Sequence, residues 1–382
     1  MTTLTSNLAK TLNGSTNFTV GDDTYRWSDR FLETLTFWAP DDAPQRSVTL
    51  AFAGNSWGSG LLRVAGNISS TFVDKTTGAT DETRVVIDVI TYANSGINRL
   101  TLVNAEAAVI KGYGGTEHVK IGSFAEAVLL GRGNDSLTLT GTGEVDQVNL
   151  GRGNDRLFIG DGFVGTVDMA RGEDIVTVGA GGAEYINLGR DADTIRFNPA
   201  THDGIVNGGE GISDDLPGAA DSDTVDFSAF TTGVTVDLLG RYSVSVPNGT
   251  VLISNFENAI GGAGKDTLVA SDDVNRLTGG AGADTFAFAT TAEAHGDRIL
   301  DFSQTQKDRI SLSDIDAKTT VSGNDAFTFI GTSAFHKKAG ELRYEIKSGD
   351  TIIQGDVNGD GVRDFSIILD ASINMKATDF IL

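Results

Sequence analysis

The sequence predicts an all-β protein, built as a parallel β-roll or β-solenoid with a β-rich cap at its N-terminus. Two observations carry this prediction. A glycine-rich turn that ends in aspartate occurs as GGAGKDTL at Gly261–Leu268, and again 18 residues later as GGAGADTF at Gly279–Phe286. Two such nine-residue units in register are typical of stacked parallel coils. Glycine is also abundant, at 48 of 382 residues, and its frequent recurrence disfavours long helices.

A looser form of the same turn recurs in the middle of the chain. Its copies are LGRGNDSL (Leu130–Leu137), LGRGNDRL (Leu150–Leu157), MARGEDIV (Met169–Val176) and LGRDADTI (Leu188–Ile195). A second set of turns and strands alternates with them, and we expect its strands to end in the inward pairs Val119/Ile121, Val148/Leu150, Val167/Met169 and Ile186/Leu188. Each coil then has two turns and two strands, with two inward residues per strand. Stacking such coils buries an apolar core between two parallel sheets.

We expect the chain to divide into four segments. They are a β-rich N-terminal cap or module (1–105), degenerate β-roll repeats (106–228), the purest repeats (229–290) and a C-terminal domain (291–382). An insertion at 212–222 interrupts the repeat. In the first segment, β-branched and apolar residues predict strands at 48–52 and 84–92, whereas the apolar residues between 31 and 38 have the spacing of one short helical face. A stack of coils needs a cap over its first coil, and this segment is expected to be that cap. The alternative is that it forms a specific binding or catalytic module.

Composition excludes several classes of partner. The net charge of −23 and the pI near 4.4 disfavour nucleic acid and anionic membranes as partners. The same charge opposes compaction unless cations neutralise it, so we expect a bound cation. The absence of cysteine excludes disulfides and thiolate metal sites. No apolar run is long enough for a membrane span, and residues 1–8 lack the features of a Sec leader.

From about residue 205 onward the chain resembles the repeat-in-toxin (RTX) family, and residues 291–382 resemble the C-terminal domain of the serralysin metalloproteases. The motifs that carry the resemblance are Gly279–Phe288, Gly296–Ser303, Asp308–Ser313, Gly355–Gly361 and Asp379–Leu382. The resemblance implies a β-roll with Ca²⁺ between successive turns and export through a type I channel by an uncleaved C-terminal signal. Its partners would then be an ABC exporter, an adaptor and an outer-membrane channel.

The resemblance does not extend to proteolysis. Serralysins carry H-E-x-x-H on a helix, and none of the four histidines stands in that pattern; they are His118, His202, His295 and His336. We therefore expect no peptidase activity.

The purest turns are the first candidates for Ca²⁺ binding, because glycine lets the backbone aim carbonyl oxygens inward and aspartate adds a hard anionic oxygen. The resemblance assigns carboxylates and carbonyls here to Asp266, Asp284, Gly261, Ala263, Gly280 and Gly282. It also suggests Asp301 and Asp308, which flank a later turn.

Two further groups of candidates have open alternatives. Asp135, Asp155, Asp174 and Asp193 end the middle turns, where Arg132, Arg152, Arg171 and Arg190 line the same edge. The aspartates either bind Ca²⁺ or cross-link the coils by Arg–Asp salt bridges. Asp356, Asn358, Asp360 and Asp364 match positions 1, 3, 5 and 9 of an EF-hand loop. Position 12 is Ile367 instead of glutamate, so a tight turn held by Asx hydrogen bonds is the alternative.

These observations predict a secreted, extracellular calcium-binding protein with a non-enzymatic surface, matrix or adhesive role and a glycan or cell-surface ligand. The alternative is an extracellular enzyme acting on polysaccharides through the N-terminal module and first coils. A coil-flank groove lined by carboxylates and aromatic residues would favour the enzyme, and a flank laddered with Arg and Asp would favour the binding protein.

Overall fold

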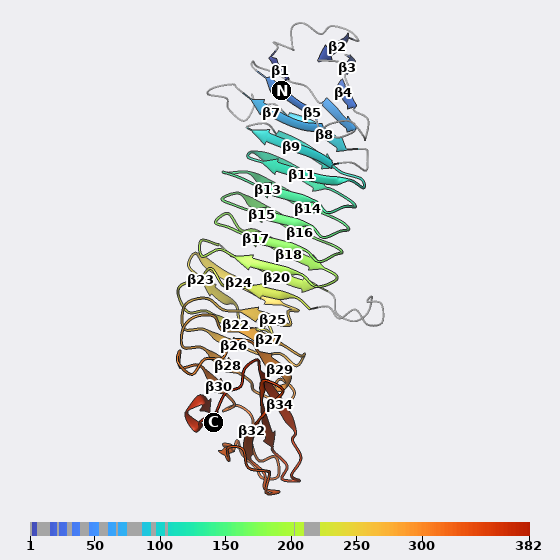
Figure 1. The fold of residues 1–382 in the computed structure, drawn as a ribbon. Helices are drawn as coiled ribbons and strands as arrows, with labels where there is room; N and C mark the ends of the chain where they lie inside the picture. Colours follow the sequence, from blue (N-terminus) through green and yellow to red (C-terminus); the bar gives the residue numbers. More distant parts are fainter. Residues whose placement is uncertain are drawn as a thin grey trace. The chain divides into compact units, whose positions relative to one another are not determined.

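The computed structural model confirms the all-β parallel fold (Figure 1). It describes the strands β1–β9 of the first 105 residues, and then residues 106–201, 203–209 and 222–382. The insertion predicted at 212–222 lies outside the described residues except for Ser222. The described residues contain one 3₁₀ turn, Ala377–Asp379, and no α-helix.

The chain forms two compact units. The first comprises residues 1–193 with 201–205, and the second 194–200 with 206–382. The segment boundaries predicted at 105, 228 and 290 therefore fall inside these units.

The first unit contains two sheets, both mainly parallel (Figure 1). One holds β1 (Thr2–Thr5), β5 (Arg46–Phe52), β7 (Ile68–Asp74), β9 (Ile97–Val103), β11 (Thr116–Ile121), β13 (Ser136–Leu139), β15 (Arg156–Ile159) and β17 (Ile175–Val178). The other holds β2 (Thr16–Val20), β3 (Asp23–Ser28), β4 (Glu33–Trp38), β6 (Gly60–Ala65), β8 (Val86–Tyr92), β10 (Glu106–Lys111), β12 (Phe124–Leu129), β14 (Glu144–Asn149), β16 (Phe163–Asp168) and β18 (Ala183–Gly189). Successive coils thus add one strand to each sheet.

The N-terminal residues take part in this stack. The strands predicted at 48–52 and 84–92 are present as β5 and β8, and parallel pairing already joins β4 to β6 and β5 to β7. The helical face predicted between 31 and 38 is wrong, because β4 occupies Glu33–Trp38. Threonines alternate there with Leu35 and Phe37, and this period of two with β-branched residues favours a strand. The antiparallel β2–β3 hairpin precedes the first parallel pair of its sheet.

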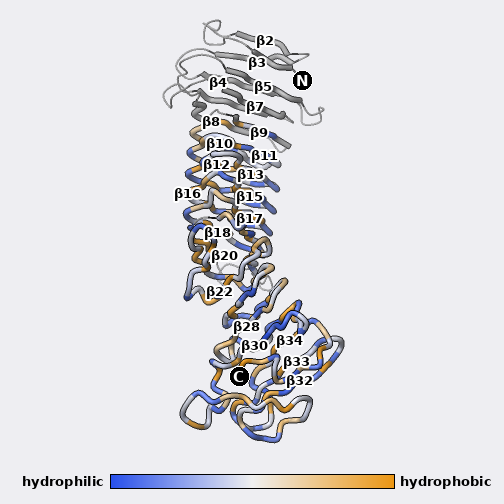
Figure 2. Tube along the Cα trace, turned by 90° about the vertical axis from the view of Figure 1, so that its left-hand side faces the viewer, coloured by the Kyte–Doolittle hydropathy of each residue, from blue (hydrophilic) through white to orange (hydrophobic). Residues whose placement is uncertain are grey.

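The core of the first unit lies between the two sheets, and two residues of each strand from β12 to β17 are buried in it. Leu137 pairs with Leu157, and Val148 with Val167; all four are at most 3% exposed. Figure 2 shows the resulting alternation of hydrophobic and hydrophilic residues along the chain.

Val119 and Ile121 lie in the first sheet and not, as the sequence predicts, in the second. Val119 pairs with Leu137, so it follows the same kind of turn as the aspartate-ended copies. The turn before it, Gly112–Glu117, has glutamate where the later copies have aspartate, and this substitution hides it from a search for the repeat. The strand that precedes Val148 in the second sheet is β12.

Glycine is required where successive turns touch. Gly153 has a left-handed φ of 128°, and a Cβ built on it would lie 1.8 Å from the carbonyl oxygen of Gly133 on the preceding coil. Any side chain therefore separates the coils at this turn.

We expect Gly153→Ala to lower the free energy of unfolding by more than about 1 kcal/mol, because the backbone strain and the overlap add. Gly114→Ala is the matched control, because a Cβ there meets nothing within 4 Å; its effect should stay within about 0.5 kcal/mol. Urea unfolding of both variants measures the difference. Equal stabilities would show that the turns do not need this close approach.

The second unit also contains two parallel sheets, with shorter strands. One holds β19 (Thr194–Phe197), β21 (Thr224–Asp226), β25 (Asn258–Ile260), β27 (Arg276–Thr278) and β29 (His295–Ile299), and the other β22 (Thr235–Asp237), β26 (Thr267–Val269), β28 (Thr285–Ala287), β30 (Arg309–Ser311) and β35 (Phe380–Ile381). β20 (Gly204–Gly209) contributes residues to both units. β23 (Val244–Val246) and β24 (Gly249–Ser254) form a hairpin.

The C-terminal part of this unit is antiparallel. β32 (Glu341–Lys347), β33 (Asp350–Asp356) and β34 (Phe365–Leu369) form a meander that joins the first sheet through β29 and β34, and β31 (Thr328–Phe329) pairs with β32. The last strand, β35, is parallel to β30, with Phe380 opposite Ile310. Phe380 is 5% exposed, and its ring lies 5.1 Å from that of Phe329.

Candidate metal centres

The aspartates of the middle turns form a ladder along one edge of the first unit. The backbone N–H of Asp135 donates to Oδ1 of Asp155, that of Asp155 to Asp174, and that of Asp174 to Asp193, each at 2.7 Å. The N–H of Glu117 donates in the same way to Asp135 at 2.7 Å. All four aspartates are at most 2% exposed. Each carboxylate therefore ties its coil to the preceding one.

In three of these carboxylates the second oxygen has no donor. Oδ2 of Asp135, Asp155 and Asp174 is buried without a hydrogen-bond partner in the structure. Burial raises the pKa of Asp155 to about 7 and that of Asp174 to about 8. The hydrogen bond from the preceding coil lowers each pKa, and the charge of the neighbouring aspartate raises it further. A buried charge needs a partner, so the ladder suits either a bound proton or a bound cation.

The alternative of Arg–Asp salt bridges is wrong for Arg132, Arg152 and Arg171. Their side chains are exposed, whereas the ladder aspartates are buried. The ion pairs found among the described residues, such as Arg196–Asp226 at 3.2 Å, include none of these three arginines. Arginine and aspartate, three positions apart on the same turn, thus face different environments.

The purest turns of the second unit continue the same hydrogen-bond pattern. The N–H of Asp266 donates to Oδ1 of Asp284 at 2.8 Å, and the N–H of Asp284 to Oδ1 of Asp308 at 3.0 Å. Asp266 also accepts from Val234 at 2.8 Å and from Gly262 at 2.6 Å. The structure thus brings Asp266, Asp284 and Asp308 together on one turn edge.

Asp284 is the carboxylate of this edge with one oxygen that lacks a hydrogen-bond donor. Its Oδ2 is buried without a hydrogen-bond partner. Burial and the negative charges of Asp308, Asp266 and Asp301 raise its pKa to about 6. Burial likewise raises the pKa of Asp308.

Asp301 reaches this edge from a different turn. Its two oxygens accept from the N–H groups of Gly279 and Gly280 at 2.8 and 2.7 Å, and its charge acts on Asp284.

The expected carbonyl ligands lie on these turns. A Cβ on Gly261 would lie 2.5 Å from both Oδ2 of Asp266 and the carbonyl oxygen of Gly279, so only glycine lets these oxygens approach. The carbonyl oxygens of Gly261, Ala263, Gly280 and Gly282 accept no backbone hydrogen bond among those described outside the strands. Carbonyl oxygens without such hydrogen bonds are of the kind that a hard cation binds.

The EF-hand-like segment is held by its own hydrogen bonds. Asp356 accepts from Gly359 and Gly361 at 2.6 and 2.9 Å, and Asp364 accepts from Val357 and Asn358, both at 2.7 Å. Asn358 and Asp360 each accept from the N–H two residues further on, at 2.8 and 2.7 Å. This is the geometry of the Asx-turn alternative.

The sequence pattern missed a buried carboxylate on the opposite edge of the second unit. Asp297 is fully buried, its Oδ1 accepts from the N–H of Asn275 at 2.9 Å, and its Oδ2 has no partner in the structure. Burial, with the charges of Glu293 and Asp273, raises its pKa to about 8. The sequence feature that could have revealed Asp297 is Gly296-Asp297, in which a glycine precedes an aspartate as in the other turns, although without the residue that separates them there.

The donor sets fit a hard cation that is coordinated largely by backbone oxygens. No group of three or more His, Cys, Asp or Glu side chains in the described residues is arranged to hold a metal ion by itself. Ca²⁺ takes six to eight oxygen ligands, including carbonyls. At Asp284, a buried carboxylate oxygen without a hydrogen-bond partner lies on a turn with glycine carbonyl oxygens. Carboxylate and carbonyl oxygens together are the kinds of ligand that Ca²⁺ takes. A cation there would neutralise charges that the fold otherwise leaves buried.

The fold and these turns define a parallel β-roll with aspartate-ended repeats. Residues 215–382 match the family described as peptidase M10 serralysin C terminal, and this segment is a domain of the RTX β-roll type. The chain has no match among the curated proteins. Within the described residues, no helix is long and apolar enough to cross a membrane.

Proposed function

We propose that this is a secreted, extracellular calcium-binding protein that folds on meeting external Ca²⁺ after type I export. The observation that carries the proposal is the serralysin C-terminal domain at 215–382, whose central turns hold Asp284 with a buried oxygen lacking a donor. External Ca²⁺ would complete this turn, whereas the lower concentration inside the cell leaves the charges bare. The proposed ligands are the turn residues named above, with Asp266 and Asp284 as the principal carboxylates.

Export by an exporter, adaptor and outer-membrane channel requires an accessible signal. In the folded domain, Phe380 is buried against β30 and Phe329. A tail in this position is not available to a receptor. This supports recognition of the tail before folding, and folding outside.

The role outside the cell is proposed to be non-enzymatic, at a surface or in a matrix. A groove on the turn edge of the first unit is lined by arginines, Tyr113 and Asn149, and by no carboxylate. A glycoside hydrolase generally uses a pair of carboxylates that flank the scissile bond. The groove therefore supports a binding role over glycoside hydrolysis.

Removing residues 323–382 is expected to keep the protein inside cells that carry a type I exporter, because this segment contains the proposed signal. Immunoblots of medium and cell fractions measure the distribution. Gly153→Ala is the control, since it weakens the first unit and leaves the tail intact; it should still be exported. Attaching 323–382 to an unrelated passenger should cause its export. Wild-type levels of the truncated protein in the medium would contradict the proposed route.

A further inference from the structure

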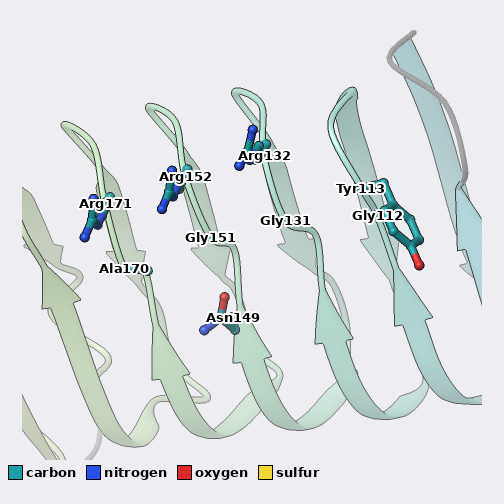
Figure 3. A pocket seen from close by; sticks show the side chains of 9 residues that line it. All are labelled: Gly112, Tyr113, Gly131, Arg132, Asn149, Gly151, Arg152, Ala170 and Arg171. Atoms are coloured by element: carbon teal, nitrogen blue, oxygen red, sulfur yellow. The ribbon is translucent and has the colours of Figure 1, made fainter.

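Three arginines form a continuous cationic column on the turn edge of the first unit. Arg132 pairs with Arg152 and Arg152 with Arg171 through isolated parallel bridges of the backbone, so their side chains repeat at the coil spacing of about 4.8 Å. Figure 3 shows them on three successive turns. All three are exposed, and no carboxylate of the described residues forms an ion pair with them. On a chain of net charge −23, this is a local strip of positive charge.

The column lines a groove with a volume of about 480 Å³. Its floor consists of turn residues without long side chains, namely Gly112, Gly131, Gly151 and Ala170. Tyr113, which is 67% exposed, and Asn149 complete the lining (Figure 3). The side-chain N–H of Asn149 donates to Asp168 at 2.8 Å, which leaves its Oδ1 as an acceptor. The groove thus combines a row of cations with an aromatic ring and an amide oxygen.

We propose that this groove binds a linear acidic polysaccharide whose sugars carry carboxylates. Guanidinium groups bind carboxylates through two parallel hydrogen bonds. Because the arginines repeat at the strand spacing of about 4.8 Å, a linear polymer that carries carboxylates along its length can pair with more than one of them at once. The ring of Tyr113 offers an apolar face for a sugar ring, and Asn149 accepts from a hydroxyl.

The narrow width of the charged strip distinguishes this ligand from bulkier polyanions. Nucleic-acid-binding domains are usually basic as a whole, with a pI above about 9, whereas this chain has a pI near 4.4 and its strip is one residue wide. A single polymer chain can follow so narrow a strip, whereas a vesicle surface brings its charge against the acidic remainder of the protein. The inference rests on the proposed extracellular role, because that role places the groove where such polymers occur.

The test is calorimetric titration of the full-length, Ca²⁺-loaded protein with a hexamer of galacturonic acid, and with its neutral methyl ester. The triple variant Arg132→Gln, Arg152→Gln, Arg171→Gln should bind the hexamer about 10- to 100-fold more weakly, as expected for three exposed charge pairs. High salt should weaken wild-type binding, and Tyr113→Ala should also reduce affinity. The control is Lys120→Gln, Arg156→Gln, Arg276→Gln, which removes the same charge from exposed positions elsewhere; its affinity should match that of the wild type.

Equal affinity of the two triple variants, or no binding of the hexamer by the wild type, would overturn the proposal. Tighter binding of single-stranded DNA or of phosphatidylglycerol vesicles would also overturn it. The Ca²⁺-dependent thermal midpoint and the export of each variant are measured alongside. If the arginine triple variant loses hexamer binding but keeps its Ca²⁺-dependent thermal midpoint and its export, the result supports the groove as the binding site. If the wild-type protein binds the hexamer but its thermal midpoint does not respond to Ca²⁺, only the proposed calcium role is refuted.

Discussion

Millimolar Ca²⁺ is expected to raise the thermal midpoint of the chelated full-length protein by at least about 5 °C. One site filled at about 100 times its dissociation constant adds about 2.7 kcal/mol, and each kcal/mol corresponds to about 2–4 °C for a domain of this size. The physical reason lies at Asp284, where a buried oxygen has no donor and neighbouring carboxylates repel one another. Differential scanning calorimetry in EDTA and in Ca²⁺ measures the shift.

Asp284→Ala is expected to remove a large part of this shift, because it deletes the carboxylate at the centre of the turn edge. Asp314→Ala is the matched control: Asp314 is exposed and lies in the same family domain. It should keep the full response. Identical midpoints with and without Ca²⁺ in the wild type would refute calcium-dependent folding, and a full response in Asp284→Ala would refute the assignment of this residue.

The metal-free protein is expected to lose stability as the pH rises from about 5 to about 8, by about 2–5 kcal/mol. The pKa is about 7 for Asp155 and about 8 for Asp174 in the folded chain, against 3.8 as the ordinary value. Between these values the folded state holds more protons than the unfolded state, so its stability is greatest below the unfolded pKa and falls as the buried groups ionise. Urea unfolding in chelator across this range measures the slope.

Asp155→Asn is expected to reduce this slope and to stabilise the metal-free protein at the upper end of the range, because the amide keeps an oxygen for the N–H of Asp135 and carries no charge. Asp146→Asn removes an exposed carboxylate of the same unit and should leave the slope unchanged. A stability that rises with pH, or an Asp155→Asn slope equal to that of the wild type, would show that the ladder carboxylates do not titrate as buried groups.

The fold class and the aspartate positions could be predicted because they depend on short-range patterns. A glycine-rich turn followed by alternating apolar residues specifies a coil within one repeat. Asp135, Asp155 and Asp174 were found in this way, and so were the inward residues Leu137 and Leu157. Turn copies without the pattern were missed. Glu117 replaces aspartate, and Asp297 follows a single glycine, so neither stood out until its hydrogen-bond partner was known.

The sequence by itself determined that the chain winds into coils, which residues face the core and where acidic turns recur. Only the tertiary structure decided what faces those turns. Arg152 and Asp155 share one turn, yet the aspartate is buried against the N–H of Asp135 one coil earlier, while the arginine stacks between Arg132 and Arg171 in solvent. The physical reason is distance along the chain: strand periodicity acts over two residues, whereas the partners of a turn residue lie a whole coil away, and only stacking in register brings them together.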